Sequence, residues 1–253
     1  MNWRLIEQNE YNAAMNMAID HVIYESVASG KENPTIRFYK WASNSVSIGA
    51  YQNSKEINLE ACKNHNVQIV RRMTGGRAVF HDKADFTYSI AAPIRFFKYR
   101  IENAYREICS CIINALNDFG IKAVLENKND ILVDNKKISG NAARLMDKGI
   151  YLQHGTLIYD IDHEVMPKIL NISSDLINDR ATSILQNKKM SQKEVYNALK
   201  NNFIANKHFK VGELSNYEIM RAKDLAKTRY STIMLPSGTL IRNKGACYVE
   251  RGG

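Results

Sequence analysis

Segments with strand character follow one another in groups along this chain, instead of alternating strictly with helices. Alternating apolar and polar residues, rich in aromatic and β-branched side chains, predict strands at 36–41, 46–48, 67–70, 86–91, 121–125, 130–133, 136–139 and 151–159. Apolar residues at helical spacing predict helices at 12–29, 59–65, 102–119, 164–171, 191–205 and 216–228. Strict strand–helix alternation would favour a doubly wound parallel sheet. The observed order therefore predicts an α+β fold with a mixed, largely antiparallel sheet flanked by helices.

Connecting segments shape the expected organisation of the chain. Residues 42–45 separate two short strands and predict a hairpin. Residues 172–192 are polar and weakly periodic, and they are the nearest feature to a linker. A chain of 253 residues can hold one large domain plus a small appendage. We therefore expect a main domain over 1–190 and a small helical and hairpin segment over 191–253 packed on it, with a turn at 236–238.

The charge and the hydrophobic pattern narrow the class of protein. A formal net charge of +9 at pH 7 attracts anions or an acidic protein partner. The lysines are scattered, with no compact basic run interleaved with aromatics, so we expect no nucleic-acid partner. No segment approaches the roughly 20 consecutive apolar residues that cross a bilayer. Polar and acidic residues stand where a signal peptide would have an apolar core, so we expect a cytoplasmic protein with no membrane partner.

The four cysteines show no metal-site spacing. Cys62, Cys109, Cys111 and Cys247 form no CxxC pair, and Cys109 and Cys111 fall within a helical pattern. Zinc sites need tighter ligand spacing, and free thiols are usual in a reducing compartment. We therefore interpret all four as structural.

A glycine pair flanked by arginines is the first segment that carries chemistry. Residues Arg71–Asp82 read RRMTGGRAVFHD. Glycines let backbone N–H groups approach an anion, consecutive N–H groups can form a nest, and arginine grips phosphate or carboxylate. An ordinary Gly-Gly hairpin with solvent-facing arginines explains the spacing equally well.

Two further segments are ambiguous when each is taken alone. Residues Asn129–Arg144 read NDILVDNKKISGNAAR and place Lys137 beside small residues, where its charge suits a polarised carbonyl and a phosphate oxygen. A surface turn with solvated lysines is the simpler interpretation. Residues Tyr151–Leu157 read YLQHGTL. A lone histidine in an apolar strand is more often a hydrogen-bonded core residue than a catalyst.

In this order, the three segments resemble the motifs of the lipoyl/octanoyl transferase and lipoate–protein ligase superfamily, which is related to biotin protein ligases. Ligases of that superfamily show RRxxGGxAVFHD, then NDxxV and KKxSGxA, then HG. An Arg-Ala-Thr-Ser stretch at 180–183 adds to the likeness, which spans roughly residues 1–230. The chain resembles lipoate–protein ligase A in a single-catalytic-domain form, because it is too short for the full C-terminal accessory domain.

The resemblance implies a role for each motif residue. It makes Lys137 the catalytic residue, which stabilises negative charge in the transition states. The residues that it implies for binding ATP and lipoyl-AMP are Arg72, Gly75, Gly76, Arg77, Ala78, Val79, Phe80, Asn129 and Asp130. Those that it implies for the acyl pocket are His81, His154 and Gly155. It assigns no metal ligand.

The implied reaction has two steps. Lipoate, or octanoate, attacks ATP with the help of Mg²⁺ to give the acyl-AMP, and a lysine of an acceptor protein then takes the acyl group. The implied acceptors are lipoyl domains of 2-oxoacid dehydrogenase E2 subunits and the glycine cleavage H protein. The short C-terminal segment also suggests a separate accessory protein for the activation step.

An octanoyl or lipoyl transferase that takes the acyl group from a carrier is the alternative. Arg77 stands where ligases commonly have a third glycine, and TGGRAV with LQHG is also typical of octanoyltransferases. In the relevant subgroup of transferases a nucleophilic cysteine lies just upstream of the lysine strand. Residues 120–140 contain no cysteine, which favours the ligase. A non-catalytic binding module is a third possibility, against which Lys137 and the glycine pair argue.

Overall fold

Among the described residues, eight strands form one mixed sheet in the spatial order β11-β1-β2-β6-β10-β9-β8-β7. The computed structural model describes residues 2–53, 56–234 and 240–242. The strands are β1 Trp3–Tyr11, β2 Thr35–Trp41, β6 Phe86–Pro93, β7 Val124–Glu126, β8 Asp130–Val133, β9 Lys136–Leu145, β10 Ile150–Leu157 and β11 Phe209–Val211. Strand β1 is parallel to β2 and β11, and the other neighbours are antiparallel. The predicted α+β class with a mixed, largely antiparallel sheet is confirmed.

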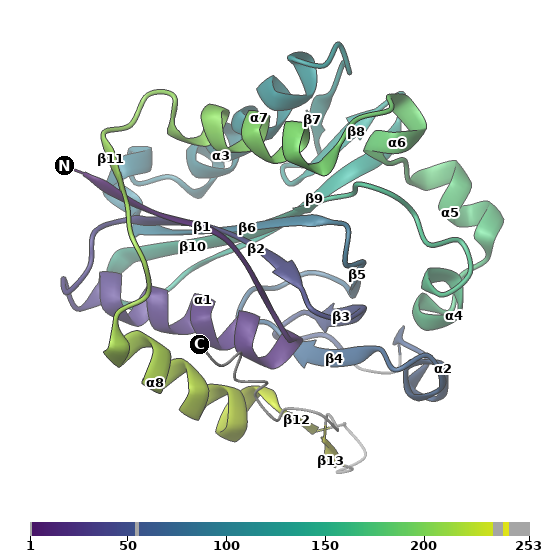
Figure 1. The fold of residues 1–253 in the computed structure, drawn as a ribbon, viewed down its shortest axis with the longest axis horizontal. Helices are drawn as coiled ribbons and strands as arrows, with labels where there is room; N and C mark the ends of the chain where they lie inside the picture. Colours follow the sequence, from purple (N-terminus) through teal and green to yellow (C-terminus); the bar gives the residue numbers. More distant parts are fainter. Residues whose placement is uncertain (1, 54–55, 235–239, 243–253) are drawn as a thin grey trace.

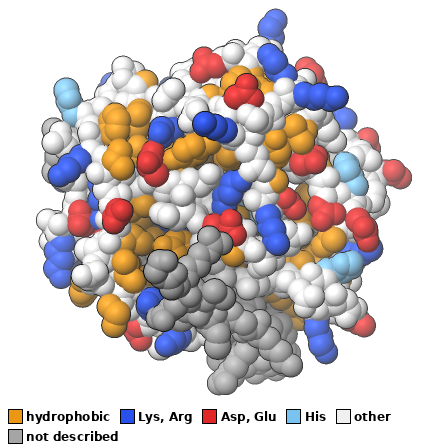
Figure 2. Space-filling view, in the orientation of Figure 1, with side chains coloured by type: hydrophobic (Ala, Val, Ile, Leu, Met, Phe, Trp, Pro, Cys, Tyr) orange, Lys and Arg blue, Asp and Glu red, His pale blue; other side chains and the backbone are white. Residues whose placement is uncertain are grey.

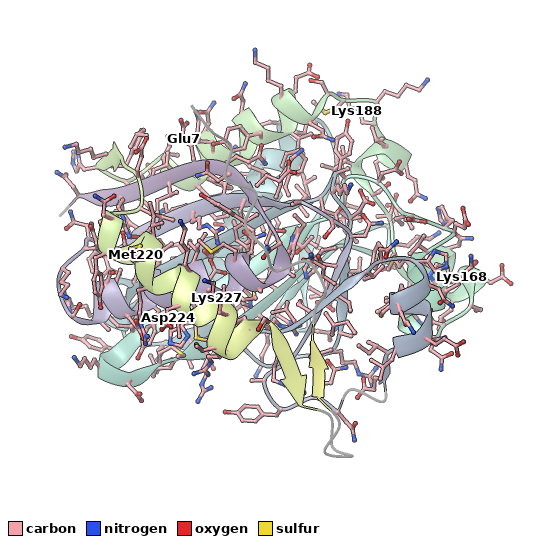
Figure 3. All side chains as sticks on the ribbon, turned by 60° about the horizontal axis from the view of Figure 1, so that its bottom comes forward. Glu7, Lys168, Lys188, Met220, Asp224 and Lys227 are labelled. Atoms are coloured by element: carbon pink, nitrogen blue, oxygen red, sulfur yellow. The ribbon has the colours of Figure 1, made fainter. Side chains whose placement is uncertain are left out.

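Helices cover both faces of this sheet (Figure 1). One face carries α3 Ile101–Asn117 and α7 Gln192–Ile204, which bury apolar residues with the sheet in one hydrophobic cluster. The other face carries α1 Ala13–Ala28 and α8 Asn216–Leu225, which form a second cluster. Helix α1 lies between the sheet and α8 and is buried over most of its length. Figure 3 shows α8 on the outside of the molecule, and its labelled residues Met220 and Asp224 are exposed.

A smaller sheet lies beside the large one and supports the glycine motif. It contains β3 Ser45–Ile48, β4 Gln68–Arg71 and β5 Val79–His81, with β3 in the middle, parallel to β4 and antiparallel to β5. Helices α2 Leu59–Asn64 and α4 Met166–Leu170 pack against it in a third cluster. The predicted hairpin across 42–45 is wrong, because β2 pairs within the large sheet and β3 within the small one.

The segment that was expected to be linker-like contains regular structure. The segment 172–192 contains α5 Ser174–Arg180 and α6 Ile184–Asn187, where Ile177 and Ile184 are buried. Short helices also occupy Ile94–Phe97, Asp147–Gly149 and Ala226–Tyr230. Strands β12 Thr232–Met234 and β13 Leu240–Arg242 pair antiparallel, and the predicted turn at 236–238 lies outside the described residues.

The elements after residue 190 are divided between the two faces of the large sheet. Helix α7 packs on α3, whereas α8 packs on α1. A buried ion pair also connects α8 to β1. The Nη1 and Nη2 atoms of Arg4 each lie 2.8 Å from a carboxylate oxygen of Glu218. The boundary between a main domain and a C-terminal segment at residue 190 stays a prediction.

The surface agrees with scattered charge. In Figure 2, lysine, arginine and acidic side chains are intermixed over the visible face, without a large continuous basic patch. Within the described residues, no helix combines the length and the apolar character needed to span a membrane.

Candidate active site

The glycine motif forms a loop between β4 and β5, and Arg72 braces this loop from its buried side. Its Nη1 donates to the carbonyl oxygen of Ser47 at 2.7 Å, and its Nη2 donates to those of Gly75 and Arg77 at 2.8 and 2.7 Å. Burial lowers the pKa of the Arg72 guanidinium to about 10. No carboxylate among the described residues forms an ion pair with Arg72. Arg72 therefore shapes the loop and leaves an uncompensated positive charge beside it.

The bracing sets the direction of the loop amides. In a trans peptide the C=O of one residue and the N–H of the next point in opposite directions. The carbonyls of Gly75 and Arg77 point at Arg72, so the N–H groups of Gly76 and Ala78 point away from it. Within the described residues, no acceptor is recorded for the N–H groups of 75–78. We call the N–H groups of Gly76 and Ala78 the amide cradle; such amides are suited to receiving an anionic oxygen.

Lys137 lies on β9, facing this loop across a cavity. Its Nζ is 2.7 Å from Oδ1 of Asp130 on β8. A Cβ on Gly140 would come within 2.7 Å of Lys137 Cε, so the lysine side chain crosses β9 at this glycine. The lysine side chain remains 39% exposed, which leaves its ammonium group accessible to a ligand.

An amide pair fixes the strand that carries Lys137. Asn129 donates from its side chain to the carbonyl of Asn141 at 2.9 Å, and Asn141 returns the same bond to the carbonyl of Asn129 at 3.0 Å. Tyr88 donates to Oδ1 of Asn141 at 2.7 Å. A Cβ on Gly155 would collide with that side chain, so only glycine leaves room for this network.

His81 forms part of the buried wall. Its ring stacks on Trp41 with centroids 4.1 Å apart and an interplanar angle of 15°. Ser47 Oγ lies 2.8 Å from Nε2, and Thr156 Oγ1 lies 3.2 Å from Nδ1. Burial and the charge of Arg72 hold the pKa of His81 well below its usual value. The imidazole is therefore neutral at physiological pH and offers an uncharged surface.

These segments surround one cavity of about 590 Å³, counting its open mouth. Its buried walls come from α1, β2, β3, β5 and β6, and its exposed side from the glycine loop and the strands around Lys137. The lining residues are Met17, Tyr39, Trp41, Ser47, Arg72, Gly76, Arg77, Ala78, Val79, His81, Thr87, Asn129, Lys137, Gly140, Asn141, Ala142, His154, Gly155 and Thr156. The three sequence motifs, far apart in the chain, thus meet around one space.

Most of the residues singled out from the sequence lie on this cavity. Those that line it are Lys137, Arg72, Gly76, Arg77, Ala78, Val79, Asn129, His81, His154 and Gly155. Gly75, Phe80 and Asp130 do not. Gly75 presents its carbonyl to Arg72, Phe80 packs in the cluster of the small sheet, and Asp130 pairs with Lys137.

The sequence motifs miss the buried end of the cavity. That end includes Met17, Tyr39, Trp41 and Thr87, which belong to elements that look like ordinary core segments. Asn141 carried a signal, since it follows Lys137 within the small-residue stretch. The others carried none, because only the folded arrangement brings α1 and β2 beside the motifs.

The model of the lipoyl protein ligase A/B catalytic domain matches residues 12–204. The chain belongs to this family. An octanoyltransferase LipM of Halalkalibacterium halodurans is 31% identical, covering 91% of this chain and 96% of that protein. A structure of lipoate-protein ligase A bound with ATP is 29% identical with a TM-score of 0.82, covering 94% of this chain and 99% of that one. A bipartite lipoate protein ligase of Thermoplasma acidophilum, studied with its E2 lipoyl domain, is 27% identical with a TM-score of 0.81, covering 96% and 98%.

The octanoyltransferase relatives correct the predicted reaction. The prediction of an ATP-dependent lipoate–protein ligase is wrong, and with it the predicted ATP, Mg²⁺ and lipoyl-AMP. The contacts give a physical reason why the motifs mislead. Arg72 holds loop carbonyls and Asp130 holds Lys137, so both have roles that need no nucleotide. The described residues also contain no cluster of three or more His, Cys, Asp or Glu side chains suited to a metal ion.

None of the cysteines that the structure describes lines the cavity. Cys62 is in the small-sheet cluster, and Cys109 and Cys111 are buried on α3. Burial raises the pKa of the thiols of Cys62 and Cys109, to about 11 and about 12, and that of Cys111 as well. Such thiols are poor nucleophiles because little thiolate is present. Cys247 lies outside the described residues.

We expect the combined replacement of Cys62, Cys109 and Cys111 by alanine to leave the rate of acyl transfer within about threefold of the wild type. The reason is that none of the three lines the cavity and that their thiolate content is low. The measurement is kcat/KM for transfer to an acceptor domain. A loss of a hundredfold in a folded variant would place a catalytic thiol among these three.

Proposed function

We propose that the chain is an acyltransferase that moves an octanoyl group from a thioester donor to a lysine of an acceptor protein. The observation that carries this proposal is the single cavity in which Lys137 and the amide cradle meet beside a buried wall of Met17, Tyr39 and Trp41. An apolar wall with a few convergent polar groups suits an acyl chain with one reactive carbonyl. The names of the octanoyltransferase relatives support the same acyl group.

The reaction balances with the groups present. The neutral amine of the acceptor lysine attacks the thioester carbonyl carbon, a C–N bond forms, and the carbonyl oxygen becomes an oxyanion. The C–S bond then breaks, and the donor leaves as a thiol after taking up the proton that the amine releases. The Lys137 ammonium and the amide cradle stabilise the oxyanion, as preorganised donors do in other acyl transfers.

The ion pair with Asp130 gives Lys137 a defined resting position. The carboxylate lies 2.7 Å from Nζ on the neighbouring strand, and both side chains are partly exposed. A negative oxyanion in the cavity would compete with Asp130 for the same ammonium group. Asp130 therefore serves as a counter-ion that holds Lys137 over Gly140 until the acyl carbonyl arrives.

We expect Gly140→Ala to lower kcat/KM by about tenfold or more while the protein stays folded. The added methyl group would occupy the space of Lys137 Cε and Nζ, and a shift of about 1 Å in a catalytic group can lower a rate a hundredfold. The acyl-transfer rate and the thermal midpoint of unfolding are both measured for the variant and for the wild type. An unchanged rate would show that the resting position of Lys137 has no bearing on catalysis.

The proposed acceptor is a lipoyl domain of an E2 subunit, or the glycine cleavage H protein. The structurally similar ligase of Thermoplasma acidophilum was studied with an E2 lipoyl domain, which supports the first of these. The net charge of +9 would steer an acidic acceptor toward this chain. The accessory protein was predicted for activation of the acyl group by ATP. Transfer from a thioester needs no such activation, so this proposal includes no accessory protein.

The test supplies octanoyl-loaded acyl carrier protein and an unmodified lipoyl domain to the purified chain. We expect the mass of the lipoyl domain to rise by one octanoyl group without ATP. Product formed only from free octanoate or lipoate together with ATP would overturn the proposal. If the enzyme itself gained the mass of one octanoyl group and hydroxylamine removed it, the reaction would pass through an acyl-enzyme and the direct transfer would be wrong.

A further inference from the structure

The residue just before the glycine pair is anchored in the protein core. Thr74 is fully buried, and its carbonyl accepts the N–H of Ala50 at 2.8 Å. Its Oγ1 lies 2.5 Å from Nε2 of His154 on β10. Thr74 thus links the loop to the large sheet, directly before the two glycines that lead into the cradle.

His154 is in turn anchored to helix α1. Its Nδ1 lies 3.4 Å from Oδ2 of the buried Asp20. The other carboxylate oxygen of Asp20, Oδ1, lies 2.7 Å from Nη1 of Arg37. Burial raises the pKa of the Asp20 carboxyl, but Arg37 and the hydrogen bonds from His154 and Ser89 outweigh it, so the pKa lies below its usual value. The carboxylate is ionised and can only accept a hydrogen bond.

The ionised carboxylate fixes the direction of its own bond to His154. Because Asp20 accepts, Nδ1 of His154 carries a proton and donates it. In the singly protonated ring Nε2 has a lone pair, and Thr74 Oγ1 donates to it. This fixes the Thr74 hydroxyl in one orientation and ties α1, β10 and the glycine loop together.

The arrangement resembles a nucleophilic triad in its order of groups but not in its exposure. Thr74 has no solvent-exposed surface and is not among the residues that line the cavity. A buried hydroxyl cannot reach an acyl carbonyl in the cavity without movement of the loop. The contacts therefore suit a supporting role, in which the hydroxyl holds the loop and the amides of Gly76 and Ala78 act on the substrate.

We propose that Asp20, His154 and Thr74 form a positioning relay, whose hydrogen bonds hold the amide cradle in the orientation that receives the oxyanion. The inference rests on the proposed acyl transfer, since the oxyanion is its intermediate. It assigns to His154 a role in aligning the loop, in addition to its place in the cavity wall. Thr74 and Asp20 are positioning residues and do not touch the substrate.

Thr74→Val tests the relay because it removes the hydroxyl and keeps the shape. We expect kcat to fall by about ten- to a hundredfold, with the KM for the octanoyl donor changed less than threefold, since a misaligned cradle weakens the transition state and not donor binding. Thr74→Ser keeps the hydroxyl and is expected to recover most of the lost kcat. Equal loss in the valine and serine variants, or an unchanged kcat in the valine variant, would overturn the proposal.

Two variants at His154 divide the relay into halves. In His154→Gln the side-chain amide can reach the position of Nε2 and keep the hydrogen bond to Thr74. In His154→Asn the shorter amide reaches the position of Nδ1 and keeps only the hydrogen bond to Asp20. We expect the glutamine variant to retain at least about ten times the kcat of the asparagine variant. These variants also test the relay if Thr74→Val fails to fold. The reverse order of activities would contradict a relay that acts through Thr74.

A spectroscopic readout separates this inference from the proposed function. In ¹⁵N-labelled wild-type protein, the His154 ring is expected to show a protonated Nδ1 and an unprotonated Nε2. The amide resonances of Gly75 and Gly76 are expected to shift in Thr74→Val and to return toward wild type in Thr74→Ser. This outcome can be read even if no octanoyl transfer is found, which would refute only the proposed function. The opposite tautomer, or an acyl adduct on Thr74 detected by mass spectrometry, would refute the relay.

Discussion

Replacing Lys137 by alanine is expected to lower kcat/KM for octanoyl transfer by about 10²–10³-fold, the usual effect of removing one preorganised oxyanion donor. Lys137 is the one cavity-lining lysine in the described part of the chain, and its ammonium group faces the same space as the amide cradle. The expected loss is in kcat, because the charge acts on an oxyanion that the thioester substrate does not yet have. The measurement is single-turnover transfer to a lipoyl domain, with donor affinity determined separately.

Lys136→Ala is the matched control for this experiment. It removes the same charge from the adjacent residue of the same strand, and Lys136 does not line the cavity. Its rate is expected to stay within about threefold of the wild type. If both variants lost the same activity, the effect would come from the net charge or from steering of the acceptor, and the catalytic assignment of Lys137 would fail.

The lysine-and-loop arrangement explains why motif reading found the family but misjudged the reaction. An acyl-adenylate and an acyl thioester present the same carbonyl carbon and develop the same oxyanion. Residues that serve this shared centre, such as Lys137 and Gly76, cannot reveal the leaving group. The lack of a cysteine at 120–140 by itself favours a ligase, yet octanoyltransferase relatives match over most of the chain.

The fold was predictable where apolar, aromatic and β-branched residues recur with a regular period. The amphipathic helix at 102–119 corresponds to α3 Ile101–Asn117, and the predicted strand at 130–133 is β8. Strand β1 was not predicted, because it lies between two neighbours and buries even Arg4, whose partner Glu218 is 214 residues away. Such a long-range pair leaves no local pattern, and the same applies to the side chains that α1 contributes to the cavity.

Asp20→Asn is expected to lower the free energy of unfolding by about 3–5 kcal/mol, the range found when one partner of a buried ion pair is removed. Arg37 is 1% exposed and would keep its charge without a carboxylate to balance it. The matched control is Glu7→Gln, which makes the same charge change in an ion pair of 2.8 Å between partly exposed side chains of Glu7 and Lys200. There we expect a loss of less than about 1 kcal/mol. Equal losses in both variants would contradict a special weight for the buried pair.

The same substitution has a defined dependence on pH. The folded-state pKa of Asp20 lies below the ordinary value of 3.8. Burial raises this pKa, but the positive charge of Arg37 and the hydrogen bonds to the carboxylate lower it by more. A carboxyl with a lowered folded pKa contributes stability that is fully present above its unfolded pKa and is lost as the pH falls through the folded pKa. The difference between the unfolding free energies of the wild type and Asp20→Asn, measured in urea, should therefore be constant from pH 5 to 7. It should shrink below about pH 3.8. A gap that widened in acid would mean that Asp20 is protonated in the folded protein, and the direction assigned to the His154 bond would then be reversed.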